Sequence, residues 1–211
     1  MFVEHLPDDR GQAHTLEAFT AALLLVAGLI FATQATAVTP LSASTSNQHV
    51  ENQAAIAAQD VLTTTGESGN LTAALLYYED GEFVDSGDET SYSGVPPASH
   101  PLHDPLTEAF GDRQIAFDIE VFYPEDGGNR TGDTTMVDMG SPSDNAATAS
   151  TRVALYGDDR LFNASVDDPG DATYSGPRLA EESQHDYLAP SAGGSDTLYT
   201  VVEVRITAWQ M

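Results

Sequence analysis

The fold is decided by Ala18-Phe-Thr-Ala-Ala-Leu-Leu-Leu-Val-Ala-Gly-Leu-Ile-Phe-Ala-Thr33, an apolar stretch near the N-terminus. It opens a longer run, Ala18 to Val50, that contains no Asp, Glu, Lys or Arg. With residues 34–38 the apolar part reaches about 20 residues, and a helix of that length crosses a hydrocarbon core of about 30 Å. A helix in a soluble core normally keeps a polar face, whereas this stretch lacks charge all round. We therefore expect a membrane-spanning helix, with a buried core helix as the alternative.

The residues before this stretch differ from an ordinary secretory signal, which starts with a positively charged segment. They carry Glu4, Asp8 and Asp9 against the single base Arg10. A small-residue cleavage site is available in Ala32-Thr-Gln-Ala-Thr-Ala37. Because the positive-inside signal is also weak, the charge pattern alone leaves the orientation of the helix open.

The segment Asp9-Arg-Gly-Gln-Ala-His-Thr-Leu-Glu-Ala-Phe19 stands directly before the apolar stretch. It resembles the archaeal class III signal peptide, in which a prepilin peptidase cuts between a basic-Gly pair and Gln. The resemblance implies cleavage between Gly11 and Gln12, so that the apolar helix stays in the mature protein. Glu17 is the sixth mature residue and corresponds to the acidic residue, more often the fifth, that is thought to register a pilin against its neighbour's new amino group. Because a carboxylate at bilayer centre costs roughly 2.5–3.5 kcal/mol, the alternative is that Glu17 simply lies at the headgroup boundary.

Three stretches of the chain look like a haloarchaeal family of type IV pilin-like proteins. They are residues 10–19, the stretch Ala37-Val-Thr-Pro-Leu-Ser-Ala-Ser-Thr-Ser46 and residues 198–211. The resemblance implies one long N-terminal helix, whose lower half packs in a filament and whose upper half packs under a head. It also implies three partners, namely the lipid bilayer, a prepilin peptidase, and like subunits or other pilin-like proteins.

The charge balance restricts the environment of the protein. Asp and Glu number 33 against 7 basic residues, all of them Arg, for a formal net charge of -26. Such a chain repels itself in dilute buffer, whereas in molar salt the Debye length falls to about 3 Å and the repulsion is screened. We therefore expect a halophilic protein that binds no nucleic acid. Hydrophobic residues make up 41% of the chain, too many for an acidic disordered protein.

The rest of the sequence predicts an α+β fold with three parts: a leader (1–11), an N-terminal hydrophobic and amphipathic helix (12–64) with a bend near Pro40, and an acidic extracellular head (65–211). The helical stripe above the bend is Val50, Ala54, Ala57 and Val61. Alternating apolar residues predict strands at residues 113–123 and 198–209, with others at 134–139 and 150–156. We expect an antiparallel sheet of three to five strands packed on the upper helix. A short helix is expected at residues 70–78, capped by Asn70, with a strand as the alternative for its Tyr-rich end. Residues 79–105 are expected to be mostly loop, and residues 102–111 to form a second short helix.

Side chains that carry chemistry are few. Three glycosylation sequons begin at Asn70, Asn129 and Asn163, the last two in predicted loops. A zinc site is conceivable at His100, His103 and Asp104, with His185-Asp186 downstream, but prolines break the helix that would align the two histidines. No catalytic motif is present and the chain contains no cysteine, so we expect no enzyme, no cofactor and no metal site.

The function expected from these features is a pilin-like surface subunit, structural or adhesive, that is inserted through its N-terminal helix and assembles into a type IV pilus-like filament. It would be a single-pass protein of the cell membrane with its C-terminal head outside. The alternative is an uncleaved, membrane-anchored extracellular binding or sensory domain. An anchored secreted enzyme is a third and weaker reading.

Overall fold

The computed structural model describes residues 10–87, 90–111, 113–125, 128–168, 173–181, 187–191 and 197–210, and for residues 10–13, 34–48 and 50 it describes the backbone alone. Most of the expected leader, residues 1–9, and the pair His185-Asp186 therefore lie outside the described residues. The chain divides into two units, Met1–Asn47 and Gln48–Met211. We describe each unit by itself.

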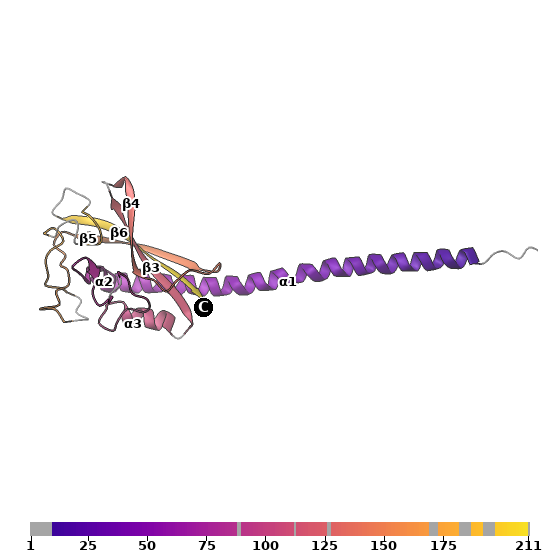
Figure 1. Cartoon of the computed structure of the whole chain (residues 1–211), viewed down its shortest axis with the longest axis horizontal. Coiled ribbons are helices and arrows are strands. Elements are labelled where there is room, and N and C mark those ends of the chain that lie inside the picture. The colour runs from indigo at the N-terminus through magenta and orange to yellow at the C-terminus, as the bar shows by residue number, and fades with distance from the viewer. Residues whose placement is uncertain are drawn as a thin grey trace, which may run out of the picture. The chain divides into compact units, whose positions relative to one another are not determined.

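The first element is α1 (Arg10–Ser68), a helix of 59 residues that enters both units (Figure 1). It contains the whole predicted helix and continues four residues past its expected end at residue 64. Pro40 lies inside α1 and does not terminate it. The bend expected near this residue stays a prediction.

The second unit is built on a four-stranded antiparallel sheet, which confirms the predicted α+β fold. The strands are β3 (Ile115–Glu125), β4 (Arg130–Val137), β5 (Ala147–Tyr156) and β6 (Leu198–Gln210). Their order is β4-β3-β6-β5, so the two predicted strands with the clearest alternation lie at the centre (Figure 1). β4 and β5 begin earlier than expected: β4 opens with the polar stretch Arg130-Thr-Gly-Asp133, and β5 with the small residues Ala147-Thr-Ala149.

Alternation along the two central strands produces the core. Ile119 pairs with Ile206 and Val121 with Val204, and all four side chains are at most 1% exposed. The same buried cluster contains Ala54, Ala58, Val61 and Leu62 from the C-terminal part of α1. This stripe differs from the expected one, because Ala57 is only partly buried while Ala58 and Leu62 face the core. Helix and sheet therefore share one core, as predicted.

A second helix, α2 (Asn70–Leu76), follows α1 after a single residue. Gly69 occupies the N-cap position with φ 82°, in the left-handed region that favours glycine. The prediction that Asn70 caps this helix is therefore wrong, since Asn70 is its first helical residue and no side-chain cap hydrogen bond forms. The backbone between the two helices therefore adopts a left-handed conformation, which glycine takes at lower cost than other residues.

The remaining helices and strands lie between α2 and β3 in the sequence. A hairpin of β1 (Tyr78–Glu79) and β2 (Glu82–Phe83) occupies the start of the segment expected to be loop. α3 (His103–Leu106) runs directly into a π-helical turn, η1 (Thr107–Gly111), which matches the short helix predicted at 102–111. α3 lies beside the C-terminal part of α1 (Figure 1).

Candidate membrane and assembly surface

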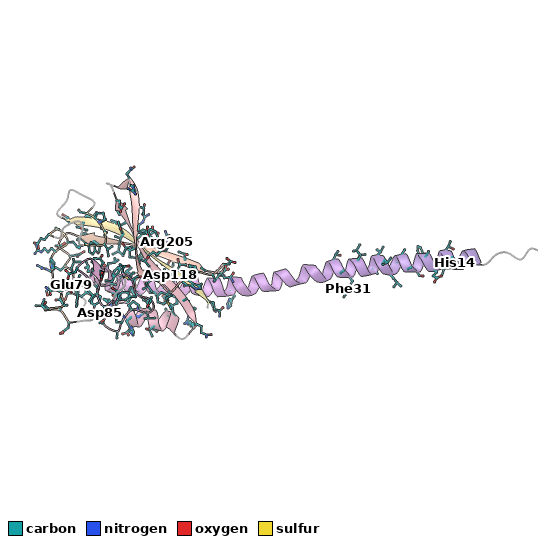
Figure 2. The ribbon with its side chains drawn as sticks, in the orientation of Figure 1. His14, Phe31, Glu79, Asp85, Asp118 and Arg205 are labelled. Atoms are coloured by element: carbon teal, nitrogen blue, oxygen red, sulfur yellow. The ribbon has the colours of Figure 1, made fainter. Side chains whose placement is uncertain are left out.

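The N-terminal span His14–Thr33 is long and apolar enough to cross a membrane, and none of it is buried. Its nine large apolar side chains are between 51% and 76% exposed. They are Leu16, Phe19, Leu23, Leu24, Leu25, Val26, Leu29, Ile30 and Phe31. Figure 2 shows the Phe31 side chain projecting outward from the helix. By contrast, the large apolar residues of the second unit are mostly buried.

These side chains surround the helix and do not form one stripe. Successive residues turn by about 100°, so the four consecutive residues 23–26 already point to every side. An apolar face of this width has no solvated side left for water. The surface is therefore suited to lipid, or to other apolar helices, in every lateral direction.

The hydroxyl groups of Thr20 and Thr33 donate hydrogen bonds to backbone carbonyls of the same helix. The Thr20 hydroxyl donates to the carbonyls of Leu16 and Glu17 at 3.1 and 2.9 Å. The Thr33 hydroxyl donates to the carbonyl of Ile30 at 2.9 Å. Such hydroxyls need no water, which is the requirement that a hydrocarbon environment imposes on polar groups.

Glu17 stands one turn after His14, and their side chains approach to 3.8 Å. Both are about four-fifths exposed, so the pair is solvated and contributes little stability. Sequence reasoning singled out Glu17 but not His14, which the spacing of three residues on a helix would have indicated. Gly11 and Gln12 lie in the first turn of α1, and their side chains are outside the described part of the chain.

The histidines of the conceivable zinc site make separate contacts in the second unit. His100 is 3% exposed and packs edge-on against Tyr77 and Tyr92, while His103 approaches the Pro96 carbonyl oxygen through Nδ1 at 2.7 Å. The His100 Nδ1 accepts a hydrogen bond from the Leu102 amide, and its buried Nε2 has no hydrogen-bond partner among the described residues. Burial, with a smaller effect of His103, lowers the pKa of His100 to about 3. Within the described ranges, no group of three potential ligands could hold a metal ion.

An open cleft of about 1070 Å³ lies in the second unit between the C-terminal part of α1 and the α3–η1 segment. Its walls carry Asp60, Asp104, Glu108 and Arg113, and Ile56 stands at it with 69% of its surface exposed. No local sequence pattern indicates this cleft, because its walls come from segments about fifty residues apart. The carboxylates and one guanidinium there suit polar or cationic solutes in general and no particular ligand.

The three sequon asparagines are far apart in the sequence and in three different settings. Asn70 opens α2, Asn129 precedes β4, and Asn163 lies in the segment between β5 and β6. Asn129 is exposed, while Asn70 and Asn163 are half-buried. These asparagines therefore form no joint site.

Comparison with known proteins gives one match. The profile of a family described as a family of unknown function (DUF7288) matches residues 10–208. No curated protein and no solved structure matches the chain. The match begins at Arg10 and thus includes the apolar span as well as the second unit.

Proposed function

Because the chain belongs to DUF7288, a family of unknown function whose profile covers both the apolar span and the head, we propose that it is a pilin-like subunit of the cell surface. In this proposal the prepilin peptidase removes residues 1–11, and α1 anchors the mature protein in the membrane with the acidic head outside. The span then packs laterally against the spans of like subunits as they assemble into a filament.

The observation that carries the proposal is the complete exposure of a span whose residues 18–33 carry no charged side chain. Burying a large apolar side chain is worth about 1.5–3 kcal/mol, and this span holds nine that the protein itself leaves uncovered. A covering of lipid or of other helices satisfies that requirement. The buried core of the head contains no residue of the span.

Small residues on one side of the span support packing between copies. Ala21, Gly28 and Ala32 fall on one side of the helix by their spacing, and a Cβ at Gly28 would touch nothing. Small residues at such spacing allow two helix backbones to approach closely in a membrane. Lateral packing would also keep the heads, with their strongly acidic surfaces, side by side, and high salt is the condition that screens their repulsion.

A cross-linking experiment tests the assembly step. The chain has no cysteine, so Ala21→Cys and Gly28→Cys each introduce the sole thiol. A disulfide requires Cβ atoms about 3.5–4.5 Å apart, so oxidation of intact membranes should join two copies only if their helices touch. Val166→Cys, in an exposed loop of the head, is the matched control. Oxidised dimers from the span and none from the control support the proposal, whereas monomers from all three variants contradict it.

The cleft in the head favours a second candidate, an uncleaved membrane-anchored binding or sensory domain. Here α1 is only a tether, and residues 1–11 are retained. Replacing Gly11 by a residue that blocks the peptidase separates the two candidates. A larger product on a blot, matched by deletion of the peptidase gene, supports the pilin; unchanged mobility in both cases supports the tether.

A further inference from the structure

We propose that Asn129 is the attachment site of an N-linked glycan, and that the sequons at Asn70 and Asn163 stay bare. The proposal goes beyond the proposed function but shares its requirement that the head lies outside the cell. Three of the chain's six asparagines begin sequons, so the sequence alone does not select one of them. A glycosyl transferase has to bind all three residues of a sequon. In the structure the three sequons differ in how accessible those residues are.

The Asn129 sequon is accessible over its whole length. Asn129, Arg130 and Thr131 are all exposed, at the end of the hairpin that joins β3 to β4. Among the residues that the structure describes, none forms a hydrogen bond with the Asn129 side chain. Figure 1 shows this end of β4 standing away from α2 and α3, so a bulky substituent there displaces no other element.

The Asn70 sequon is inaccessible because its middle residue is buried. Leu71 is 1% exposed and belongs to the core, and the three residues form the first turn of α2. A transferase would have to unwind this turn and expose Leu71 to bind the tripeptide. Such opening would remove Leu71 from the core and expose its apolar side chain to water, so it is rare in the folded protein.

The Asn163 sequon is tied into its own loop. The Asn163 side-chain oxygen Oδ1 accepts a hydrogen bond from the Ser165 backbone amide at 2.9 Å. The Asn163 backbone amide donates to the Asp167 carboxylate at 2.9 Å. The same carboxylate also accepts from the amide and hydroxyl of Ser175. Asn163 is also half-buried and follows the core residue Phe162. The side-chain oxygen and the backbone amide of Asn163 are therefore both held within the turn that a transferase would need to open.

The reaction at Asn129 requires a lipid-linked oligosaccharide as co-substrate. The side-chain nitrogen Nδ2 attacks C1 of the first sugar, the new N–C1 bond forms, and the C1–O bond to the lipid phosphate breaks. The amide loses one proton to a base of the transferase, and the polyprenyl phosphate or pyrophosphate leaves. No oxidation or reduction takes place.

A glycan at this position would also protect the sheet. β4 is an edge strand, and beyond Tyr92, which pairs with Val137 near its C-terminal end, no described residue outside the sheet pairs with it. Exposed edges invite pairing with other chains, and proteins cover or charge them to prevent it. Asn129 lies at the uncovered end of this edge.

The test is peptide mass spectrometry of the full-length protein purified from membranes of the cells that make it. Peptides with Asn129 should carry a discrete added mass, whereas those with Asn70 and Asn163 should not. Asn129→Gln and Thr131→Ala should both remove the added mass, and Thr131→Ser should keep it, because Ser and Thr both complete a sequon. Asn145→Gln, an exposed asparagine outside any sequon, is the control that should change nothing.

Two results would overturn the proposal: an unmodified Asn129, or a glycan carried instead at Asn163 or Asn70. Labelling the head from outside intact cells separates this failure from failure of the proposed function. A labelled head with a bare Asn129 rejects the glycan alone. An unlabelled head rejects both.

Discussion

The Gly176 amide donates a hydrogen bond to the Leu161 carbonyl at 3.0 Å, and this same carbonyl fills the space in which a side chain at position 176 would begin. Next to it the Leu161 amide donates to the Pro177 carbonyl at 3.0 Å, and Arg160 pairs with Arg178 as an isolated bridge. These contacts order an acidic segment that has no regular strand or helix among its described residues.

We predict that Gly176→Ala destabilises the head, because a new Cβ would collide with backbone atoms that cannot rotate away. Overpacking of this kind typically costs about 1–3 kcal/mol. Denaturant unfolding of the full-length protein in detergent measures the change in the free energy of unfolding. Gly94→Ala is the matched control, since its Cβ would meet nothing within 4 Å. Equal stabilities of the two variants would show that the contact with Leu161 is not rigid.

His100 should make the head sensitive to acid. Its pKa falls from 6.5 in the unfolded chain to about 3 in the folded protein, so the unfolded state binds more protons between these values. The stability contributed by neutral His100 is complete above pH 6.5 and is lost as the pH falls toward 3. The loss is about 1.4 kcal/mol per pH unit within that window.

The corresponding measurement compares wild type with His100→Phe, which keeps an aromatic ring between Tyr77 and Tyr92 but cannot be protonated. Unfolding free energies between pH 6 and 4 should fall less steeply in the variant, because the many carboxylates titrate alike in both proteins. His49→Gln, at an exposed position on α1, should follow the wild type. Parallel slopes for all three proteins would mean that His100 is readily protonated in the folded state.

Part of this structure could be predicted from sequence and part could not. The central strands β3 and β6 follow from strict alternation, and the exposed span follows from its lack of charge. The strand order and the pairing of Leu161 with Gly176 depend on contacts between distant segments, which a local pattern does not encode. The same holds for His100. It lies in a proline-rich segment, and its burial depends on aromatic residues from other parts of the chain. Of the candidate surface, the apolar span was predictable and the cleft was not.

Charge in the span should prevent membrane retention. An Arg at the centre of a membrane helix costs about 2.5–3.5 kcal/mol on the insertion scale, so Leu24→Arg combined with Leu25→Arg should move the protein out of the membrane fraction. Val166→Arg, equally exposed but in the head, should leave the distribution unchanged. The measurement is the fraction of protein that resists extraction of membranes with alkaline carbonate. Full retention of the double variant would argue that the span does not lie in lipid.

Salt should stabilise the head. A net charge of -26 makes the folded chain repel itself, and raising NaCl from 0.1 to 2 M reduces the Debye length from about 10 Å to below 3 Å. The midpoint of thermal unfolding should therefore rise with NaCl. Sucrose at the same water activity is the control, because it favours compact states without screening charge. A midpoint that is insensitive to NaCl would contradict the halophilic interpretation.

The central claim is that the span His14–Thr33 is kept in the finished protein, where it faces lipid or sister copies. Mass spectrometry of the N-terminal peptide of the membrane-bound protein tests it most directly. We predict that this peptide starts at Gln12, with the whole span following. A peptide that starts at Met1 would reject cleavage but keep the anchor. A start beyond Thr33 would mean that the span is discarded as a secretory signal, and it would contradict both the membrane role and the assembly role.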